Sequence, residues 1–231
     1  ALGALDDFDT KDGLQLSEAE LETGELLLLN RNFSDVRMSL DQRDGALEAF
    51  FEAQDLDGTV RFLRASTGER SLIAEFERLA LAKPLDSGMS MDTDPSELPE
   101  MHFYVRDLEY LGLNLGETSL EAYPIGDGLR IDSLRSVSDQ VTLEARGDWT
   151  GDELESRSDF DIVMTSESLG ALIDALDLSS VLEGGQTMVR YNAWWPGPPA
   201  AFELAQLNGE MNFSVVGGRL LNADPGAGRV L

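Results

Sequence analysis

The chain has 231 residues, 42% of them apolar, which is the composition of a globular protein rather than a disordered one. Its 17 Lys plus Arg against 44 Asp plus Glu give a formal net charge of −27, which disfavours nucleic acid and anionic membrane surfaces as partners. It has no cysteine, which excludes disulfides, thiolate metal ligands and cysteine nucleophiles. No apolar run approaches the roughly 18 residues of a membrane span.

Residues 1–84 are predicted to form a β-repeat segment. The stretch 33–62 aligns with 115–149, since each contains an alternating strand, an Asp-Gly turn, a second strand, an acidic turn and a third strand. The stretch 71–82 fits both a helix and a strand, and we predict a strand. Residues 85–100 are polar and contain prolines, so we expect a linker there.

From residue 101 onward, apolar and polar residues alternate with a period of two. Met101, Phe103 and Val105 point to one side of the expected strand, while His102 and Tyr104 point to the other. Turn signals separate the alternating runs at 126–128, 138–140, 150–153 and 208–209. Strands of this length joined by short turns predict an antiparallel meander, so the fold class is mainly β.

One segment departs from this pattern. Leu169, Leu172, Ile173 and Leu176 follow helical spacing, and the Gly184-Gly185 pair can end a helix. We predict one inserted amphipathic helix, at about 166–184, packed on the sheet. The remaining part, 101–231, is otherwise expected to be a single β segment.

No constellation in the sequence indicates catalysis or a metal site. The only histidine, His102, lies inside a predicted strand with no nucleophile motif near it. Trp194 and Trp195 are adjacent, so in a strand they face opposite sides and cannot form one stacking platform. We therefore predict that the chain is not an enzyme and uses no metal and no cofactor.

Three stretches resemble the C-terminal region of the AsmA-like superfamily, in its YhdP branch. They are the strand ladder at 98–149, the helical stretch at 166–185, and the closing stretch "WPGPPAAFELAQLNGEMNFSVVGGRLLNADPGAGRVL" at 195–231. The resemblance implies an antiparallel meander curled into an open, taco-like groove. It also implies a periplasmic protein of a Gram-negative bacterium, tethered to the inner membrane, that carries phospholipid between the inner and outer membranes.

On this interpretation the chain is a fragment of a longer protein. Its partners are phospholipid acyl chains and neighbouring β-repeats of the same longer chain, and not nucleic acid. Two other functions stay open: a structural or interaction segment of the envelope with a sealed core and no lipid carriage, and an acidic hydrolase. The alternation fits a closed sandwich as well as a trough, so each inward residue could equally belong to an ordinary dry core. The residues expected to line the groove are Phe103, Val105, Leu120, Leu129, Ile131, Val141, Leu143, Ile162, Met164, Val189, Tyr191, Phe213 and Val215.

Overall fold

The computed structural model describes residues 18–28, 31–43, 46–65, 68–82, 94–152, 155–167, 182–183, 185–199, 207–217 and 219–220. These residues are almost entirely β-strand, and the only helical element among them is a short 3-10 helix. The elements are β1 (Glu18–Leu28), β2 (Arg31–Arg43), β3 (Ala46–Glu52), β4 (Leu56–Arg64), β5 (Arg70–Leu81), η1 (Pro95–Glu97), β6 (Glu100–Tyr110), β7 (Leu113–Ile125), β8 (Gly128–Val137), β9 (Val141–Gly151), β10 (Ser156–Ser166), β11 (Leu182–Glu183), β12 (Gln186–Pro196), β13 (Asn208–Val216) and β14 (Arg219–Leu220).

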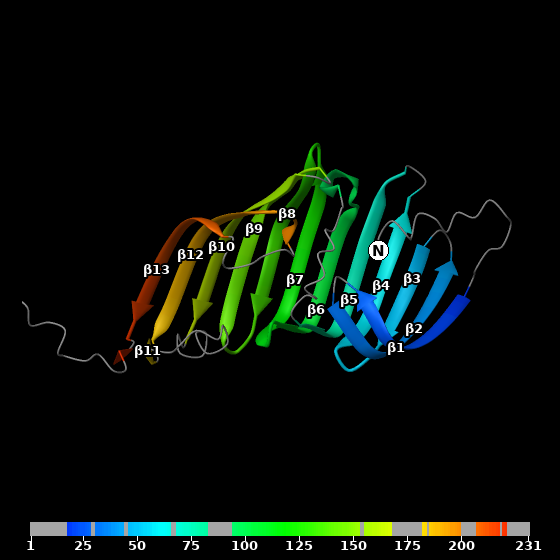
Figure 1. The fold of residues 1–231 in the computed structure, drawn as a ribbon, viewed down its shortest axis with the longest axis horizontal. Helices are drawn as coiled ribbons and strands as arrows, with labels where there is room; N and C mark the ends of the chain where they lie inside the picture. Colours follow the sequence, from blue (N-terminus) through cyan, green and yellow to red (C-terminus); the bar gives the residue numbers. More distant parts are fainter. Residues whose placement is uncertain are drawn as a thin grey trace, which may run out of the picture.

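Twelve strands form one sheet in the order β1-β2-β3-β4-β5-β6-β7-β8-β9-β10-β12-β13, and β11 pairs with β14 in a separate two-stranded sheet. Figure 1 shows the strands of the large sheet side by side in chain order. Neighbours are antiparallel, which confirms the predicted meander, with the exception of the parallel pair β5 and β6. A parallel pair requires the chain to return to the other end of the sheet, and residues 82–99 make this crossover.

The sheet is open, because its order begins at β1 and ends at β13 without pairing between them. It nevertheless curls strongly in its first half. Phe33 of β2 lies in one buried cluster with Phe76 of β5 and Val105 of β6, which are several strands away along the sheet. Arg31 Nε also donates a hydrogen bond of 2.7 Å to the carbonyl oxygen of Ala82, just beyond β5. The strands drawn in blue therefore face β5 and β6 across the inside of the curl (Figure 1).

A second buried cluster lies on the same face of the sheet, over β7 to β12. It contains Ile131, Trp149, Phe160 and Trp195, and also Leu98, which follows η1. Since η1 contacts β7, β8 and β9, this part of the connection from β5 to β6 lies on the inner face. The strands on both sides of the predicted linker 85–100 belong to one sheet.

Two local predictions need correction. Most of the predicted helix at 166–184 lies outside the described residues, but Ser166 is the last residue of β10 and Leu182–Glu183 is a strand, so these ends are not helical. Asn208-Gly209 is not a turn, because both residues lie at the start of β13, where Gly209 pairs with Ala193. The glycine is needed for a different reason: its φ of +134° brings the backbone against the Asn192 carbonyl. The prediction of a strand at 71–82 is confirmed by β5.

Candidate functional site: the apolar floor of the sheet

One row of apolar side chains crosses all twelve strands of the large sheet. Each member is the register partner of the next, so the row runs from β1 to β13 without a polar residue (the tyrosine hydroxyl aside). All members are half-buried except Ala74, which is buried, and Met211, which is 62% exposed. The members of this middle row are Ala19, Leu40, Ala49, Val60, Ala74, Phe103, Leu120, Leu134, Ala145, Ile162, Tyr191 and Met211.

The rows on either side of it contain no charged side chain. The lower row contains Leu21, Met38, Phe51, Gly58, Phe76, Val105, Thr118, Ser136, Leu143, Met164, Val189 and Phe213. The upper row, towards the β7–β8 turn, contains Gln42, Leu47, Phe62, Leu72, Met101, Ala122, Ile131, Gly147, Phe160, Ala193 and Gly209. We call these three rows the apolar floor.

The structure places every groove-lining residue of the sequence analysis on this one face. Most belong to the middle and lower rows, Ile131 belongs to the upper row, and Leu129, Val141 and Val215 lie one step beyond the floor. Val105, Leu129, Ile131 and Val141 are buried, Phe213 is 51% exposed, and the others are half-buried. The sequence analysis named none of the floor residues on β1 to β5, although the alternation of Leu72, Ala74 and Phe76 carries the same signal.

The polar side chains on this face are mostly paired with one another or with the backbone. Thr118 Oγ1 donates to Ser136 Oγ at 2.9 Å, and both residues are buried. Ser158 Oγ donates to the Gly197 carbonyl at 2.8 Å. Among the described residues, two buried side-chain atoms have no partner: Trp149 Nε1 and Thr187 Oγ1. Both lie on the inner face, towards opposite ends of the strands.

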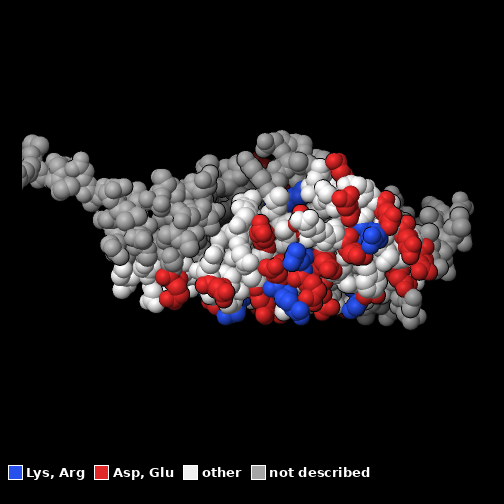
Figure 2. Space-filling model, turned by 90° about the horizontal axis from the view of Figure 1, so that it is seen from below, with Lys and Arg blue, Asp and Glu red and all other residues white. Residues whose placement is uncertain are grey.

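The opposite face of the sheet is charged and carries cross-strand ion pairs. Arg37 of β2 contacts Glu22 of β1 at 2.9 Å and Glu52 of β3 at 3.1 Å. The hydrogen bond with Glu22, the attraction of Glu52 and the hydrogen bond with Glu52 raise the pKa of Arg37 above its ordinary value. Figure 2 shows acidic and basic side chains lying beside one another on the described surface, with acidic ones in excess. Such exposed pairs keep the face wet and contribute little to stability.

The whole pattern is therefore a curled sheet with one continuous apolar face and one charged face. The chain matches the family model described as "YhdP protein" over residues 5–231. It belongs to the YhdP family. The identification of a YhdP-type, AsmA-like protein from the sequence is thereby confirmed. No curated protein and no solved structure matches the chain.

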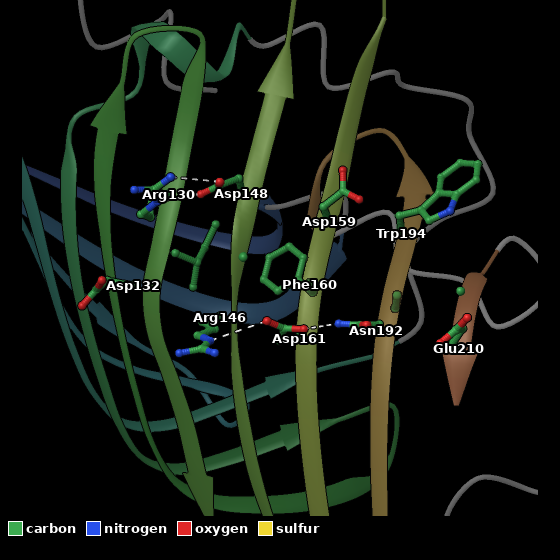
Figure 3. Close-up of a pocket in the computed structure, with 14 residues that line it drawn as sticks. Arg130, Asp132, Arg146, Asp148, Asp159, Phe160, Asp161, Asn192, Trp194 and Glu210 are labelled. Atoms are coloured by element: carbon green, nitrogen blue, oxygen red, sulfur yellow. Dashed lines mark hydrogen bonds and ion pairs between the residues drawn. The ribbon is translucent and has the colours of Figure 1, made fainter. Parts of the chain in front are cut away.

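The YhdP-family chain also has a shallow hollow of about 550 Å³, which lies on the charged face rather than on the floor. Its walls are two polar rows that cross β8 to β13, and its base is the backbone between them. Figure 3 shows Arg130 paired with Asp148 in one row, and Arg146, Asp161 and Asn192 linked in the other. Most of the charged side chains that line the hollow pair with one another or, in the case of Asp159, with Arg157. In the described ranges, no group of His, Asp and Glu side chains is arranged to hold a metal ion.

The tryptophan pair lies as the sequence predicts, one residue on each face. Trp195 is 3% exposed on the inner face, where its ring stacks on Phe160 at 5.3 Å between centroids. Trp194 lies on the charged face, with the guanidinium of Arg157 at 4.2 Å from its ring centroid. His102 lies in β6, and its Nε2 is 2.9 Å from Glu100 Oε1. In the described part of the YhdP-family chain there is no helix long and apolar enough to cross a membrane.

Proposed function

We propose that this chain is a segment of a conduit that carries phospholipid along its apolar floor. The observation that carries the proposal is the middle row, which is apolar across twelve strands and yet only half-buried along most of its length. In a sealed sandwich these positions would be buried, because the second sheet would cover them. A half-covered apolar face of this extent requires an apolar occupant.

Acyl chains fit this face in chemistry and in size. The floor is free of charged side chains, so each methylene buried on it contributes about 0.8 kcal/mol without the cost of desolvating an ion. At roughly 4.8 Å per strand, the floor extends about 50 Å from β1 to β13 along the curve of the sheet. This length exceeds that of a single acyl chain, so the floor suits passage rather than one fixed site.

Family membership supports placing this function in the cell envelope. We propose that the parent protein lies in the periplasm, is tethered to the inner membrane, and joins this segment to neighbouring β-repeats, so that phospholipid passes between the two membranes. The segment acts by binding and not by catalysis. Its charged outer face keeps the conduit soluble in an aqueous compartment, and the excess of acidic residues disfavours nucleic acid there.

The proposal is tested by mass spectrometry of lipid that co-purifies with the chain. The wild type is expected to carry phospholipid, and Ala145→Asp, which places a charge in the middle row, is expected to lose most of it. Glu144→Gln is the matched control, because Glu144 neighbours Ala145 but points to the charged face and pairs with Arg135 at 3.5 Å. A lipid-free wild type, or equal lipid in Ala145→Asp, would contradict the proposal.

A second candidate is a structural or interaction segment that pairs through its edge strands. The exposed side chains of β13, with Met211 at 62% and Phe213 at 51%, favour it, because an edge strand with exposed apolar residues invites pairing. Site-specific cross-linking from β13 in the intact protein distinguishes the two functions. Edge cross-links to another polypeptide without bound lipid would support this candidate over the conduit.

A further inference from the structure

The short helix η1, in the connection between β5 and β6, covers one end of the apolar floor. Pro95 and Leu98, at the two ends of η1, are buried, and Leu98 belongs to the cluster that contains Trp149 and Ile131. The turn is held by Asp94, whose carboxylate accepts hydrogen bonds from Ser96 N at 2.8 Å and from Ser96 Oγ at 2.6 Å. The main contacts of η1 are with strands β7, β8 and β9, and with three residues it is a small cover rather than a second layer.

Beneath this cover lies a hydrogen-bond donor without an acceptor. Trp149 is 5% exposed, and its Nε1 is buried with no partner. The indole N–H of Trp195, in the same cluster, does have an acceptor: its Nε1 donates to the Pro198 carbonyl at 3.1 Å. Buried indole N–H groups normally find an acceptor, because an unpaired buried donor is costly. The unpaired Trp149 donor can therefore take an acceptor supplied from outside.

The surroundings of Trp149 limit the chemistry of that group. The cluster around it consists of apolar side chains, among them Leu129, Phe160 and Trp195. Among the described residues the one buried cation is Arg31 of β2, and its Nε donates to the Ala82 carbonyl, so no buried Lys or Arg lies in this cluster to neutralise a phosphate. The fitting ligand is therefore a single uncharged acceptor joined to a long apolar tail. The carbonyl oxygen at the head of an acyl chain has this character, and its tail would continue over Ile131 and Ala145 on the floor.

We propose that Trp149 Nε1 binds the carbonyl oxygen of an acyl chain, and that η1 covers this site until the chain enters. The inference rests on the proposed lipid-carrying function and adds one fixed binding site for the acyl carbonyl to it. The carbonyl could belong to a phospholipid ester or to another uncharged acyl ester. Entry of the ligand exchanges the contacts of Leu98 for those of the acyl chain and gives the Trp149 donor its acceptor.

The test compares two phosphatidylcholines with the same headgroup and the same chain length, one with ester-linked chains and one with ether-linked chains that have no carbonyl. One neutral hydrogen bond changes an equilibrium about two- to tenfold, so the wild type is expected to bind the ester lipid tighter by that factor. In Trp149→Phe the preference should disappear. Trp194→Phe is the matched control and should keep it, because Trp194 lies on the opposite face beside Arg157.

A second readout uses the unmodified protein. The indole N–H resonance of Trp149 in a ¹⁵N-labelled sample should shift when the ester lipid is added and stay in place with the ether lipid. A parallel titration with methyl oleate, which is uncharged, identifies the source: a Trp149-dependent shift with methyl oleate alone assigns the site to simple acyl esters. A Trp149 resonance that moves with neither the ester lipid nor methyl oleate would overturn this binding site. Failure of the wild type to bind either lipid would overturn the proposed function instead.

The cover is tested separately through its cap. Asp94→Ala removes the hydrogen bonds to Ser96 and should let η1 lift more often, so the rate of ester-lipid uptake is expected to rise about two- to fivefold. Asp127→Ala, in the exposed β7–β8 turn, is the control and should leave the rate unchanged. An unchanged uptake rate in Asp94→Ala would show that η1 does not cover the site.

Discussion

Gly147 in the upper row of the floor is expected to tolerate no side chain. A Cβ at this position would lie 2.7 Å from Phe160 Cγ and closer still to the Asp159 carbonyl oxygen. Phe160 has little freedom to move away, because it is 7% exposed and stacked on Trp195. In Gly147→Ala the sheet must therefore open locally or the stacked pair must shift.

The magnitude follows from two opposing terms. Overpacking a well-filled site costs about 1–3 kcal/mol, while replacing glycine by alanine restricts the unfolded chain and returns about 0.4–1 kcal/mol. The difference spans about 0–2.6 kcal/mol, so Gly147→Ala should lower the free energy of unfolding by about 1.3 kcal/mol at the midpoint, or the melting temperature by about 3–5 °C for a chain of this size.

Urea unfolding followed by tryptophan fluorescence and by circular dichroism measures this loss. Gly126→Ala is the matched control, because a Cβ at Gly126 in the β7–β8 turn meets nothing within 4 Å. The control should be as stable as the wild type or slightly more stable. If Gly147→Ala unfolds at the same urea concentration as Gly126→Ala, the packing of Phe160 over the glycine is not what holds this part of the floor.

Three further predictions concern the core and the charged face. Leu56 is 0% exposed in the first buried cluster, so Leu56→Ala should lower the free energy of unfolding by about 2–5 kcal/mol. A loss below about 1 kcal/mol in a denaturant titration would contradict the central place of Leu56 in this cluster. Arg130→Gln should leave the unfolding midpoint unchanged at moderate salt, since its pair with Asp148 is exposed on both sides; a clear drop in midpoint would show that the charged face does stabilise the sheet. Desolvation raises the pKa of Tyr123 above its ordinary value of 10, and the nearby carboxylates of Glu121 and Glu100 raise it further. The fold therefore favours the neutral phenol. This contribution to stability is present below pH 10 and is lost as the pH rises through the raised pKa. The difference in ultraviolet absorbance between wild type and Tyr123→Phe should titrate above pH 10, and a midpoint at or below 10 would contradict this.

The faces of the strands could be predicted from the sequence, but their arrangement in space could not. Phe103, Leu120 and Ile162 fall on one face because side chains alternate along a strand, and this depends only on the local pattern. The parallel pairing of β5 with β6 depends on the path of the crossover, which no period-two pattern encodes. Likewise, the Asn208-Gly209 dipeptide resembles a hairpin turn locally, and only its pairing opposite Ala193 and Trp194 shows that it begins a strand.

The site divides in the same way. Trp195 and Trp194 could be assigned to opposite faces because they are neighbours in a strand. The unpaired donor of Trp149 could not be found, since it depends on which acceptors the crossover brings to the cluster. The curl of the first half of the sheet could not be predicted either, because it depends on contacts between residues far apart in the chain, such as that of Arg31 with the Ala82 carbonyl.

The parallel junction between β5 and β6 has a consequence for how the protein opens. Every other neighbouring pair in the sequence β1 to β10 is a hairpin, so each strand can join the sheet with little loss of chain entropy. At β5–β6 the chain must first close the loop 82–99, so this pairing costs more chain entropy than a hairpin does. Once formed, the junction lies inside the first buried cluster, which joins Phe33 and Phe76 to Val105 of β6, while the buried strand residues of the second cluster begin at β7. Hydrogen exchange should then resolve two foldons, β1–β6 and β7–β13, that unfold at different free energies. A conduit assembled from such units can open one length of its wall while the adjoining length stays folded.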